Sequence, residues 1–276
     1  MLLVFGFRNI ESSIMKITAV IITKNEEPNI GRCLDSLQNV ADEIIVVDAL
    51  STDKTEEICR QYSNVVFVSR EWKGYSASKN YGNSLAQHPY ILSIDADEVL
   101  SENLKLEIQA VKLSLRGTIP TARNEAELRG AYSMPRLNHI GQKAIRFSGW
   151  YPDRKIRLFP KAETNWTGDF VHERLEYEGE VKPLKSALLH YTYSSFSQYD
   201  NKMRNYGTLG AKDMFSKGKH LSWGFMVLKV FFKFFSVYIL KLGILDGLEG
   251  LNIAYESAKT IYWKYDVLQE LYKNKA

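Results

Sequence analysis

The chain has 276 residues, of which 45% are hydrophobic, 12% aromatic and 25% charged, and its formal net charge is +4. This composition is that of a globular protein with one large domain, or one domain plus an appendage, and it excludes collagen-like, disordered and disulfide-scaffold proteins. The two isolated cysteines, Cys33 and Cys59, provide neither a disulfide framework nor a zinc site. We expect each to be a small apolar residue on a helix, in a reducing cytosol.

Residues 1–14 precede a more strongly patterned start at Met15. Their apolar run is short, is followed by Arg8 and has no small-residue cleavage site, which argues against a secretory signal. We therefore expect residues 1–14 to be a poorly ordered extension. A weak membrane-contacting tail is the alternative.

Strands and helices alternate through the next part of the chain. Apolar runs predict four strands: buried ones at Ile17–Thr23 and Glu43–Asp48, and two more at Val65–Val68 and Tyr90–Ile94. Apolar residues at helical spacing predict intervening helices near 30–37, 54–62 and 76–86. This alternation is typical of an α/β fold with a mostly parallel central sheet and right-handed crossovers.

Polar residues gather where three of these strands end. Parallel sheets bind ligands outside the carboxyl ends of their strands, so three such ends predict one binding crevice. This convergence is a stronger signal than any single motif. The residues that we expect at the crevice are Thr23, Asn25, Glu26, Asp48, Ser51, Asp95 and Asp97.

The sequence Asp95-Ala96-Asp97 leaves the fourth strand for a loop. Two carboxylates spaced in this way can bracket a divalent cation and its phosphates, and Mg²⁺ and Mn²⁺ favour such hard oxygen ligands. The structural alternative is a helix-capping aspartate beside a solvated one. The sequence contains no GxGxxG and no P-loop motif, which disfavours both a dinucleotide-binding Rossmann site and a P-loop.

A nucleotide must therefore be held in another way. Asp48 could accept a hydrogen bond from a base N–H, and Lys79 could contact the base or neutralise phosphate. The structural alternatives are a helix cap for Asp48 and a solvated helix face for Lys79.

Four segments resemble the family 2 glycosyltransferases of the GT-A fold: VIITKNEE at 20–27, VVDALSTDKT at 46–55, GYSASKNYG at 74–82 and SIDADE at 93–98. Three later segments resemble the WaaE-like, lipopolysaccharide-core branch: GWYPDRKIRLFP at 149–160, VHERL at 171–175 and GILDGLEGL at 243–251. The resemblance covers residues 16–265. The set of motifs is specific for the family and less so for the branch.

The resemblance implies a nucleoside-diphosphate-sugar donor, for which we expect a UDP-sugar, a divalent metal at the DxD motif and inversion at the anomeric carbon. It also implies that Asp48 contacts the uracil side of the nucleotide, that Asp95 lies near the ribose and sugar, and that Asp97 ligates the metal. Lys79 stands where the family often carries a basic residue. In some related enzymes a late histidine completes the metal shell, for which His190 is the candidate; a hydrogen-bonded structural histidine is the alternative.

Inversion needs a single displacement and hence one general base for the acceptor hydroxyl. In the family a carboxylate occupies the position of Glu173, so we assign Glu173 as the base and His172 as a neighbour that positions substrate. A carboxylate is competent because proton transfer can be late, when the hydroxyl has become acidic. The alternatives are His172 as the base, because histidine titrates near neutrality, and a surface glutamate without a catalytic role.

The segment from Trp150 to Arg157 contains candidates for acceptor binding. Arg154, Lys155 and Arg157 alternate on a predicted strand, where we expect Lys155 opposite the other two. One face could bind diphosphate or an anionic acceptor, and a solvated cationic loop is the alternative. Trp150 and Tyr151 could stack on a sugar ring or pack under the loop.

The C-terminal quarter is basic and rich in apolar residues. Residues 201–276 hold 12 Lys and Arg against 6 Asp and Glu, a net charge of +6, whereas residues 1–200 hold 24 against 26, a net charge of −2. Between Ser222 and Leu245, a narrow polar stripe contains Lys229 and Lys233, with Lys241 at its border. No stretch reaches the roughly 18 uncharged apolar residues of a spanning helix. We therefore expect a helix at the membrane interface that favours anionic lipid; a core helix is the alternative.

Together these observations predict a GT-A catalytic domain at 15–195 and a helical, membrane-associating extension at 196–276. The expected activity is inverting, metal-dependent transfer of a sugar to a lipopolysaccharide-core or other cell-surface glycan, with the enzyme peripheral on the cytoplasmic face of the membrane. The alternatives are a polyprenyl-phosphate glycosyltransferase and a non-catalytic, membrane-bound nucleotide-sugar-binding protein. No basic run interleaved with aromatic residues suggests nucleic-acid binding.

Overall fold

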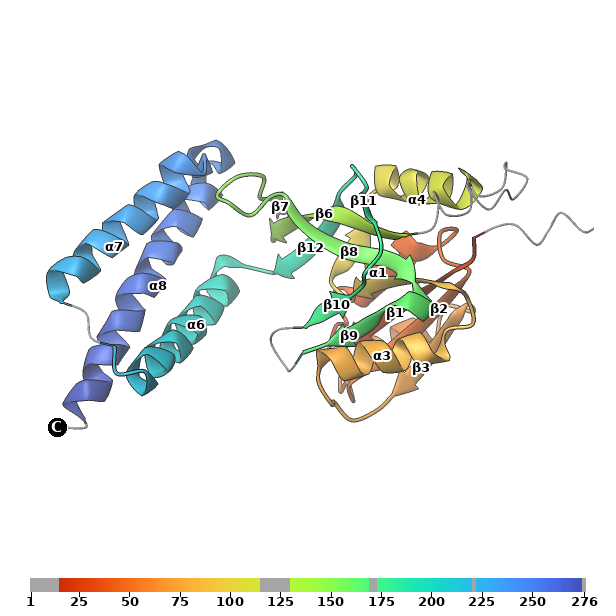
Figure 1. The fold of residues 1–276 in the computed structure, drawn as a ribbon, viewed down its shortest axis with the longest axis horizontal. Helices are drawn as coiled ribbons and strands as arrows, with labels where there is room; N and C mark the ends of the chain where they lie inside the picture. The colour runs from red at the N-terminus through yellow and green to blue at the C-terminus, as the bar shows by residue number, and fades with distance from the viewer. Residues whose placement is uncertain (1–14, 115–129, 169–172, 220–221, 275–276) are drawn as a thin grey trace, which may run out of the picture. The chain divides into compact units, whose positions relative to one another are not determined.

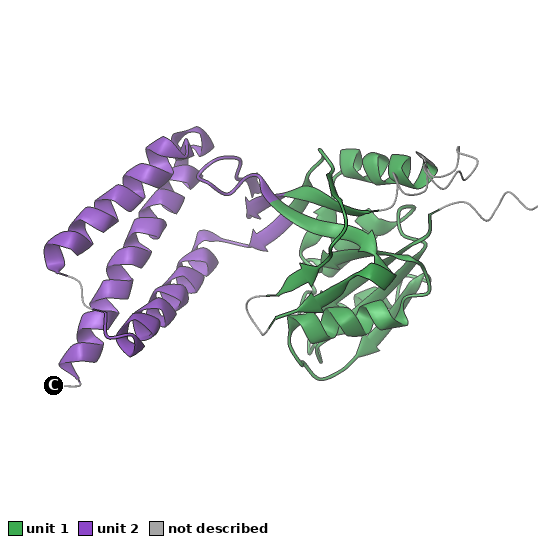
Figure 2. Ribbon diagram, viewed as in Figure 1, with its two compact units in different colours: residues 1–135, 154–189 green, residues 136–153, 190–276 purple. Residues whose placement is uncertain are grey.

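The computed structural model describes residues 15–114, 130–168, 173–219 and 222–274 (Figure 1). The expected extension at 1–14 and the candidate His172 lie outside these residues. The chain forms two compact units, one of residues 1–135 and 154–189 and the other of residues 136–153 and 190–276 (Figure 2).

The first unit is built on the predicted α/β sheet. Its four N-terminal strands have the order β3-β2-β1-β4, and the pairs β2–β3, β1–β2 and β1–β4 are all parallel. The four strands are β1 (Ile17–Thr23), β2 (Glu43–Asp48), β3 (Val65–Ser69) and β4 (Tyr90–Asp95). All four expected strands are therefore confirmed, with two ends shifted by one residue.

The sheet continues beyond β4 in the order β8-β6-β12-β5, and β11 and β7 both pair with β6. Pairing is antiparallel for β4–β8 and β6–β7 and parallel for β6–β11. These strands are β5 (Glu98–Leu100), β6 (Ala131–Ile140), β7 (Lys143–Ala144), β8 (Asp153–Pro160), β11 (Val181–Pro183) and β12 (Leu188–Tyr193). A separate antiparallel pair consists of β9 (Asn165–Thr167) and β10 (Arg174–Glu176).

Both faces of β1, β2 and β4 are buried, which explains their continuous apolar runs, whereas the edge strand β3 is partly exposed. Along β1, Ala19 and Ile21 enter one apolar cluster, whereas Val20 and Ile22 enter another. Residues of α1, α2 and α4 join the first cluster, and α3 packs against β1, β2 and β9. The helices are α1 (Ile30–Leu37), α2 (Thr55–Cys59), α3 (Tyr75–Leu85), α4 (Glu102–Ser114) and the short 3₁₀ turn η2 (Lys161–Glu163).

The two cysteines lie on helices, as expected. Cys33 is in α1 and Cys59 ends α2, and both are free thiols with no exposed surface. The helix expected at 54–62 is shorter than predicted, because α2 has only five residues.

The second unit is mainly helical. Helices α6 and α7 both pack against the long helix α8, and aromatic and aliphatic side chains fill the space between them. Its elements are α6 (Phe196–Ser216), α7 (Trp223–Phe235), the π-helical turn η3 (Ser236–Leu240), the 3₁₀ turn η4 (Gly243–Asp246) and α8 (Leu248–Lys273). This confirms the helical C-terminal extension, and residues 136–153 belong to the same unit.

Asp246 ties the segment 146–148 to the helical elements. Its Oδ1 accepts a hydrogen bond from the backbone N–H of Arg146 at 3.0 Å, and its Oδ2 accepts from that of Phe147 at 3.1 Å and from the Ser148 hydroxyl at 2.8 Å. The carboxylate is only 4% exposed and lies about a hundred positions away in sequence, so no local pattern indicates this contact.

In the described part of the chain, one helical segment, Trp223–Leu240, is long and apolar enough to cross a membrane by length and composition alone. This segment differs from the expectation from the sequence, in which Lys229 and Lys233 interrupt the apolar stretch. Only 11% of the segment is buried within the structure, so it is not a core helix of the second unit.

Candidate active site

The predicted strand ends lie side by side at one edge of the sheet. The register of β1 pairs Thr23 with Asp48 on β2 and Ile22 with Asp95 on β4. The loops that follow β1 and β2 are linked: the backbone N–H of Asn25 donates to the Ser51 hydroxyl at 2.8 Å. The structure thus brings together the crevice residues that the sequence analysis grouped.

The carboxylate of Asp48 organises its own loop. Its Oδ2 accepts hydrogen bonds from the backbone N–H of Ser51 at 2.9 Å and from the Ser69 hydroxyl at 3.0 Å. Its Oδ1 accepts from the Ser51 hydroxyl at 2.5 Å, and the residue is only 2% exposed. Asp48 therefore holds the loop after β2 and caps no helix, because α2 begins only at Thr55 with Lys54 as its N-cap. Contact of Asp48 with a base remains a prediction.

Glu26 lies close to Asp97 at the strand ends. Burial raises the pKa of Glu26, the Asn29 hydrogen bond lowers it, and the charges of Asp97 and Asp53 raise it further, with a net upward shift. Acidic side chains that adjoin in this way would be relieved of repulsion by a cation.

Lys79 links two carboxylates beneath the crevice. Its Nζ is 2.8 Å from Glu173 Oε1 and 3.2 Å from Asp95 Oδ1, and it lies 4.5 Å from the centre of the Trp166 ring. Lys79 is only 1% exposed, so it is neither on a solvated helix face nor at the surface where a phosphate could reach it without rearrangement.

Arg157 holds Asp95 from the other side. Its Nη2 donates to Asp95 Oδ2 at 2.7 Å and to Glu98 Oε1 at 2.5 Å, and the backbone N–H of Asp95 donates to Glu98 Oε2 at 3.1 Å. Burial alone would raise the pKa of Asp95, but the charges and hydrogen bonds of Arg157 and Lys79 hold it well below its usual range. Asp95 is therefore an anion clamped between two cations.

The two carboxylate oxygens of Glu173 differ in their partners. Its side chain is 27% exposed, and Oε1 is engaged by Lys79. Oε2 is buried and accepts no hydrogen bond from any residue that the structure describes. An oriented carboxylate whose second oxygen has no hydrogen-bond partner can accept a proton from a hydroxyl that reaches it.

A divalent cation would fit Asp97 better than Asp95. Both oxygens of Asp95 face cationic groups, whereas Asp97 is half-buried beside Glu26. Within the described ranges, no group of three His, Cys, Asp or Glu side chains could hold a metal by itself. Mg²⁺ is commonly bound through one or two carboxylates plus substrate phosphates, so one aspartate next to a diphosphate suffices.

The expectation that Arg154 and Arg157 share a face was wrong. Side chains alternate along a strand, so residues three apart point to opposite faces. Arg157 turns inward to Asp95, whereas Arg154 donates to the backbone oxygens of Leu184 at 3.0 Å and Ser133 at 3.4 Å. Both guanidinium groups therefore have structural partners within the first unit.

Three further candidates belong to the second unit. Trp150 packs edge-on against Tyr199, with ring centres 5.5 Å apart, which matches its structural alternative. Tyr151 is half-buried and precedes a cis-proline. The Nδ1 atom of His190 lies 2.6 Å from Asn138 Oδ1, so this histidine has the hydrogen bond expected of a structural residue.

Sequence reasoning missed two members of the buried network. Glu98, with no exposed surface, closes the motif SIDADE, and Trp166 covers Lys79 from β9. An acid directly after the DxD motif was visible in the sequence. The role of Trp166 was not, because it arises from a contact between segments almost ninety positions apart.

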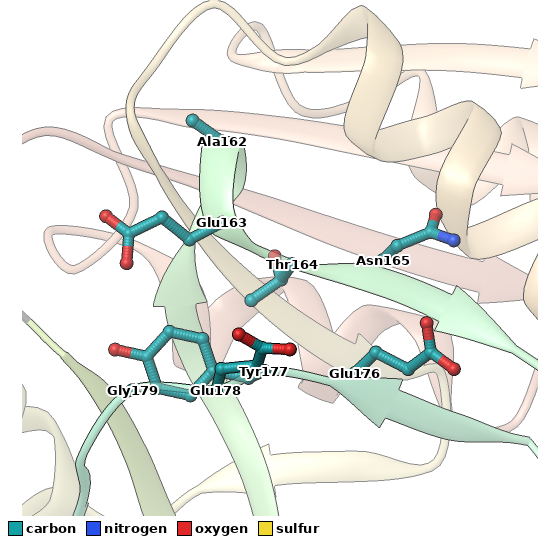
Figure 3. Close-up of a pocket in the computed structure, with 8 residues that line it drawn as sticks. All are labelled: Ala162, Glu163, Thr164, Asn165, Glu176, Tyr177, Glu178 and Gly179. Carbon is teal, nitrogen blue, oxygen red and sulfur yellow. The ribbon is translucent and has the colours of Figure 1, made fainter.

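A cavity of about 520 Å³ lies beside η2 and the β9–β10 pair (Figure 3). Its lining contains three exposed glutamates together with Thr164 and Asn165. It shares none of the crevice residues described above, and its eight lining residues are Ala162, Glu163, Thr164, Asn165, Glu176, Tyr177, Glu178 and Gly179.

Comparison with known proteins places this geometry in context. The family model described as "Glycosyl transferase family 2" matches residues 18–145. An uncharacterized glycosyltransferase of Rickettsia felis is 32% identical over 244 residues, which cover 85% of this chain and 83% of the relative. The lipopolysaccharide core biosynthesis glycosyltransferase LpsC of Rhizobium meliloti is 24% identical over 264 residues, covering 91% and 93%.

Among solved structures, S. aureus TarS 1–349 in complex with UDP-GlcNAc aligns with a TM-score of 0.45 and 14% identity, covering 94% of this chain and 92% of that one. The mannosyltransferase PcManGT of Pyrobaculum calidifontis, in complex with GDP-Man and Mn²⁺, aligns with a TM-score of 0.44 and 14% identity, covering 96% and 80%.

Proposed function

Because this chain belongs to glycosyl transferase family 2, we propose that it is an inverting, metal-dependent enzyme that transfers a sugar from a UDP-sugar to a hydroxyl of a glycan acceptor. The acceptor class that we propose is the lipopolysaccharide core or another cell-surface glycan, supported by the similarity to LpsC along almost the whole chain. The observation that carries the proposal is the juxtaposition of Glu173 and Asp95 on Lys79 at the strand ends.

Glu173 is the proposed general base. As the acceptor oxygen forms its bond to the anomeric carbon, the hydroxyl proton passes to Glu173 Oε2 and the bond to the diphosphate breaks. Lys79 fixes the direction of this carboxylate through Oε1, at 2.8 Å, and leaves Oε2 for the proton. One displacement of this kind inverts the anomeric configuration.

Asp95 and Asp97 have different proposed roles in binding the donor. The clamped carboxylate of Asp95 presents a fixed acceptor to sugar or ribose hydroxyls, and Asp97 would hold Mg²⁺ or Mn²⁺. When bound, such a cation stabilises the negative charge that develops on the leaving diphosphate. The buried ion pairs to Arg157 and Lys79 keep Asp95 charged and in place.

The catalytic domain is proposed at residues 15–195 and a membrane-associating extension at residues 196–276. The lipid-linked acceptor would be met on the cytoplasmic face of the membrane, with the enzyme peripheral there. This part of the proposal is supported by the largely exposed apolar segment Trp223–Leu240 and by the net charge of +6 over residues 201–276.

The first test measures binding and hydrolysis of UDP-, GDP-, dTDP- and CMP-sugars with and without Mn²⁺. We expect one metal-dependent donor, and binding of none of these sugars would overturn the proposal. In the variant Glu173→Gln, we expect the donor affinity to persist while transfer falls by roughly 10²–10⁴-fold, the usual contribution of a general base.

Glu163→Gln is the matched control, because Glu163 is an exposed glutamate on η2 away from the ion-pair network. It should leave transfer unchanged. If Glu173→Gln retained full turnover, the base assignment would be wrong. That result would favour a polyprenyl-phosphate acceptor, which is already an anion and needs no base.

A further inference from the structure

The apolar surface of the second unit is not confined to α7. It continues around the turn that joins α7 to α8 and onto the first turns of α8, a region that the sequence analysis did not single out beyond Leu245. Leu240, Leu245 and Leu248 are 60%, 61% and 75% exposed. Other exposed large apolar residues of this turn and its two flanks are Phe235, Ile239, Leu242, Ile244 and Leu251.

The acid of this turn points inward, whereas Lys241 is exposed. Asp246, the one acid between Ser222 and Leu248, is 4% exposed and accepts hydrogen bonds from the segment 146–148. The side chain of Lys241 runs along Gly149, where an added Cβ would lie 2.6 Å from its Cδ. The surface that faces outward therefore carries aliphatic side chains and the cation Lys241, while the one acid of the turn is used inside the unit.

One residue of the turn, Leu242, has a backbone conformation that glycine or asparagine adopts more readily than leucine does. Leu242 has a φ of 55°, in the left-handed region where a leucine is strained and where glycine or asparagine would be usual. Leu242 is nevertheless 49% exposed, so no packing inside the described part of the unit explains the choice of leucine. A large apolar residue at a strained and exposed position indicates a role outside the folded unit.

We propose that residues 239–248 form a tip that inserts into the interfacial region of an anionic lipid bilayer. The tip lies at the turn between two antiparallel helices, so both helices can present their exposed apolar side chains to the same membrane. This inference rests on the membrane association in the proposed function and makes it specific. The bilayer contact is made by a helical hairpin through its turn, rather than by α7 alone lying flat.

The charge pattern favours lipid over a second copy of the chain. The lysines of this region, Lys229, Lys233 and Lys241, are accompanied by no exposed acid between Ser222 and Leu248. Burial lowers the pKa of Lys233, and the charge of Lys241 lowers it further, so these two cations adjoin. Adjoining cations repel the same cations in a second copy, whereas they complement anionic headgroups.

The test is flotation of the full-length protein with phosphatidylcholine vesicles, with and without phosphatidylglycerol. We expect the unaltered protein to float with the anionic vesicles. The double variant Leu245→Asp/Leu248→Asp should bind at least about 100-fold more weakly, because two side chains lose their apolar transfer and gain charge. The control is Leu106→Asp on α4, which changes an equally exposed leucine, at 64%, in the first unit and should float normally.

A second variant separates membrane binding from folding. Leu242→Asn puts a residue that tolerates the left-handed region at the strained position, so the thermal midpoint should stay equal or rise while flotation weakens. Flotation of either tip variant at the level of the unaltered protein would overturn the proposal. Failure of the unaltered protein to float, with a dimer that Leu245→Asp/Leu248→Asp dissociates, would also overturn it and assign the tip to self-association.

UDP binding, measured on the same samples, distinguishes this inference from the proposed enzymatic function. We expect the tip variants to retain the UDP affinity of the unaltered protein. Flotation that depends on the tip, in a protein that binds no nucleotide, would support the tip and reject the enzyme. Nucleotide binding without flotation would support the proposed enzyme and reject the membrane-inserting tip.

Discussion

At the scale of single residues, the structure assigns Lys79 a task that its sequence context does not reveal. Its ammonium group lies between Asp95 and Glu173, at 3.2 and 2.8 Å, and is only 1% exposed. One cation therefore neutralises two carboxylates that approach each other from β4 and from the segment before β10. Without it, like charges would face each other in a poorly solvated place.

Replacement of this cation should be costly. In Lys79→Met, a side chain of similar length leaves both carboxylates without their shared partner, and we expect a loss of about 3 kcal/mol in the free energy of unfolding. This expected loss is at the lower end of the range for breaking a buried ion pair, because Asp95 and Glu173 are each about a quarter exposed. Urea unfolding measures it.

The control for that variant is Lys105→Met, which removes the exposed pair between Lys105 and Glu102 on α4. Surface pairs contribute little, so the change should stay within about 0.5 kcal/mol. Equal losses from the two variants would show that the buried ion pairs do not stabilise the fold.

The sequence predicted which residues gather at the crevice, but not how they are connected. Strand ends follow from apolar runs of strand length, so Asp48 and Asp95 could be placed at the same edge of the sheet, on either side of β1, before any coordinates. The partners of Lys79 could not, because Trp166 and Glu173 lie almost ninety or more positions away and reach it through β9 and the segment before β10. Arg157 was identified as a cation, but its inward direction depends on the register of β8 against β4.

At the scale of elements, the position of α3 determines where Lys79 sits. Gly82, one turn after Lys79, faces β1 and β2 so closely that an added Cβ would lie 2.4 Å from Val20 Cγ1 and 3.1 Å from Val47 Cγ2. The helix can approach the sheet only because this position has no side chain. The same approach places the Lys79 ammonium group at the strand ends.

The variant Gly82→Ala tests this packing. We expect it to reduce the free energy of unfolding by about 2 kcal/mol, because the two valines belong to a closely packed sheet and cannot yield freely. Gly31→Ala in α1 is the control, since its Cβ would meet only Ile58 at an ordinary 3.7 Å. That variant should be neutral or stabilising by up to about 1 kcal/mol. Similar results for both in urea unfolding would contradict the packing argument.

The elements also show where local patterns stop being informative. The strands β1 and β2 match their predicted bounds, because burial on both faces produces an uninterrupted apolar run. The turns η3 and η4 were read as a continuation of one amphipathic helix. Their true course depends on Gly250, where a Cβ would lie only 1.8 Å from the backbone oxygen of Gly243, and on the long-range partners of Asp246. Close approaches of this kind leave no periodic signal.

At the scale of the whole molecule, the two thiols report on the integrity of the first unit. Cys33 on α1 and Cys59 on α2 have no exposed surface and belong to the same apolar cluster. Burial raises the pKa of Cys33 well above its ordinary value, with the neighbouring acids adding to the effect, and burial raises the pKa of Cys59 to about 12. The reactive thiolate is therefore scarce in the folded protein at neutral pH, and it is shielded from reagents.

We expect neither cysteine to react with a thiol-specific reagent at pH 8 in the native protein, and both to react promptly in denaturing urea. Labelling rates measured at increasing urea concentrations should then follow the opening of the first unit, because α1 and α2 must separate from the sheet before either sulfur is reached. The variant Gly82→Ala should accelerate labelling in native buffer, since it loosens the same unit, whereas Gly31→Ala should not. Rapid labelling of the unaltered protein without urea would show that α1 and α2 do not pack stably on the sheet.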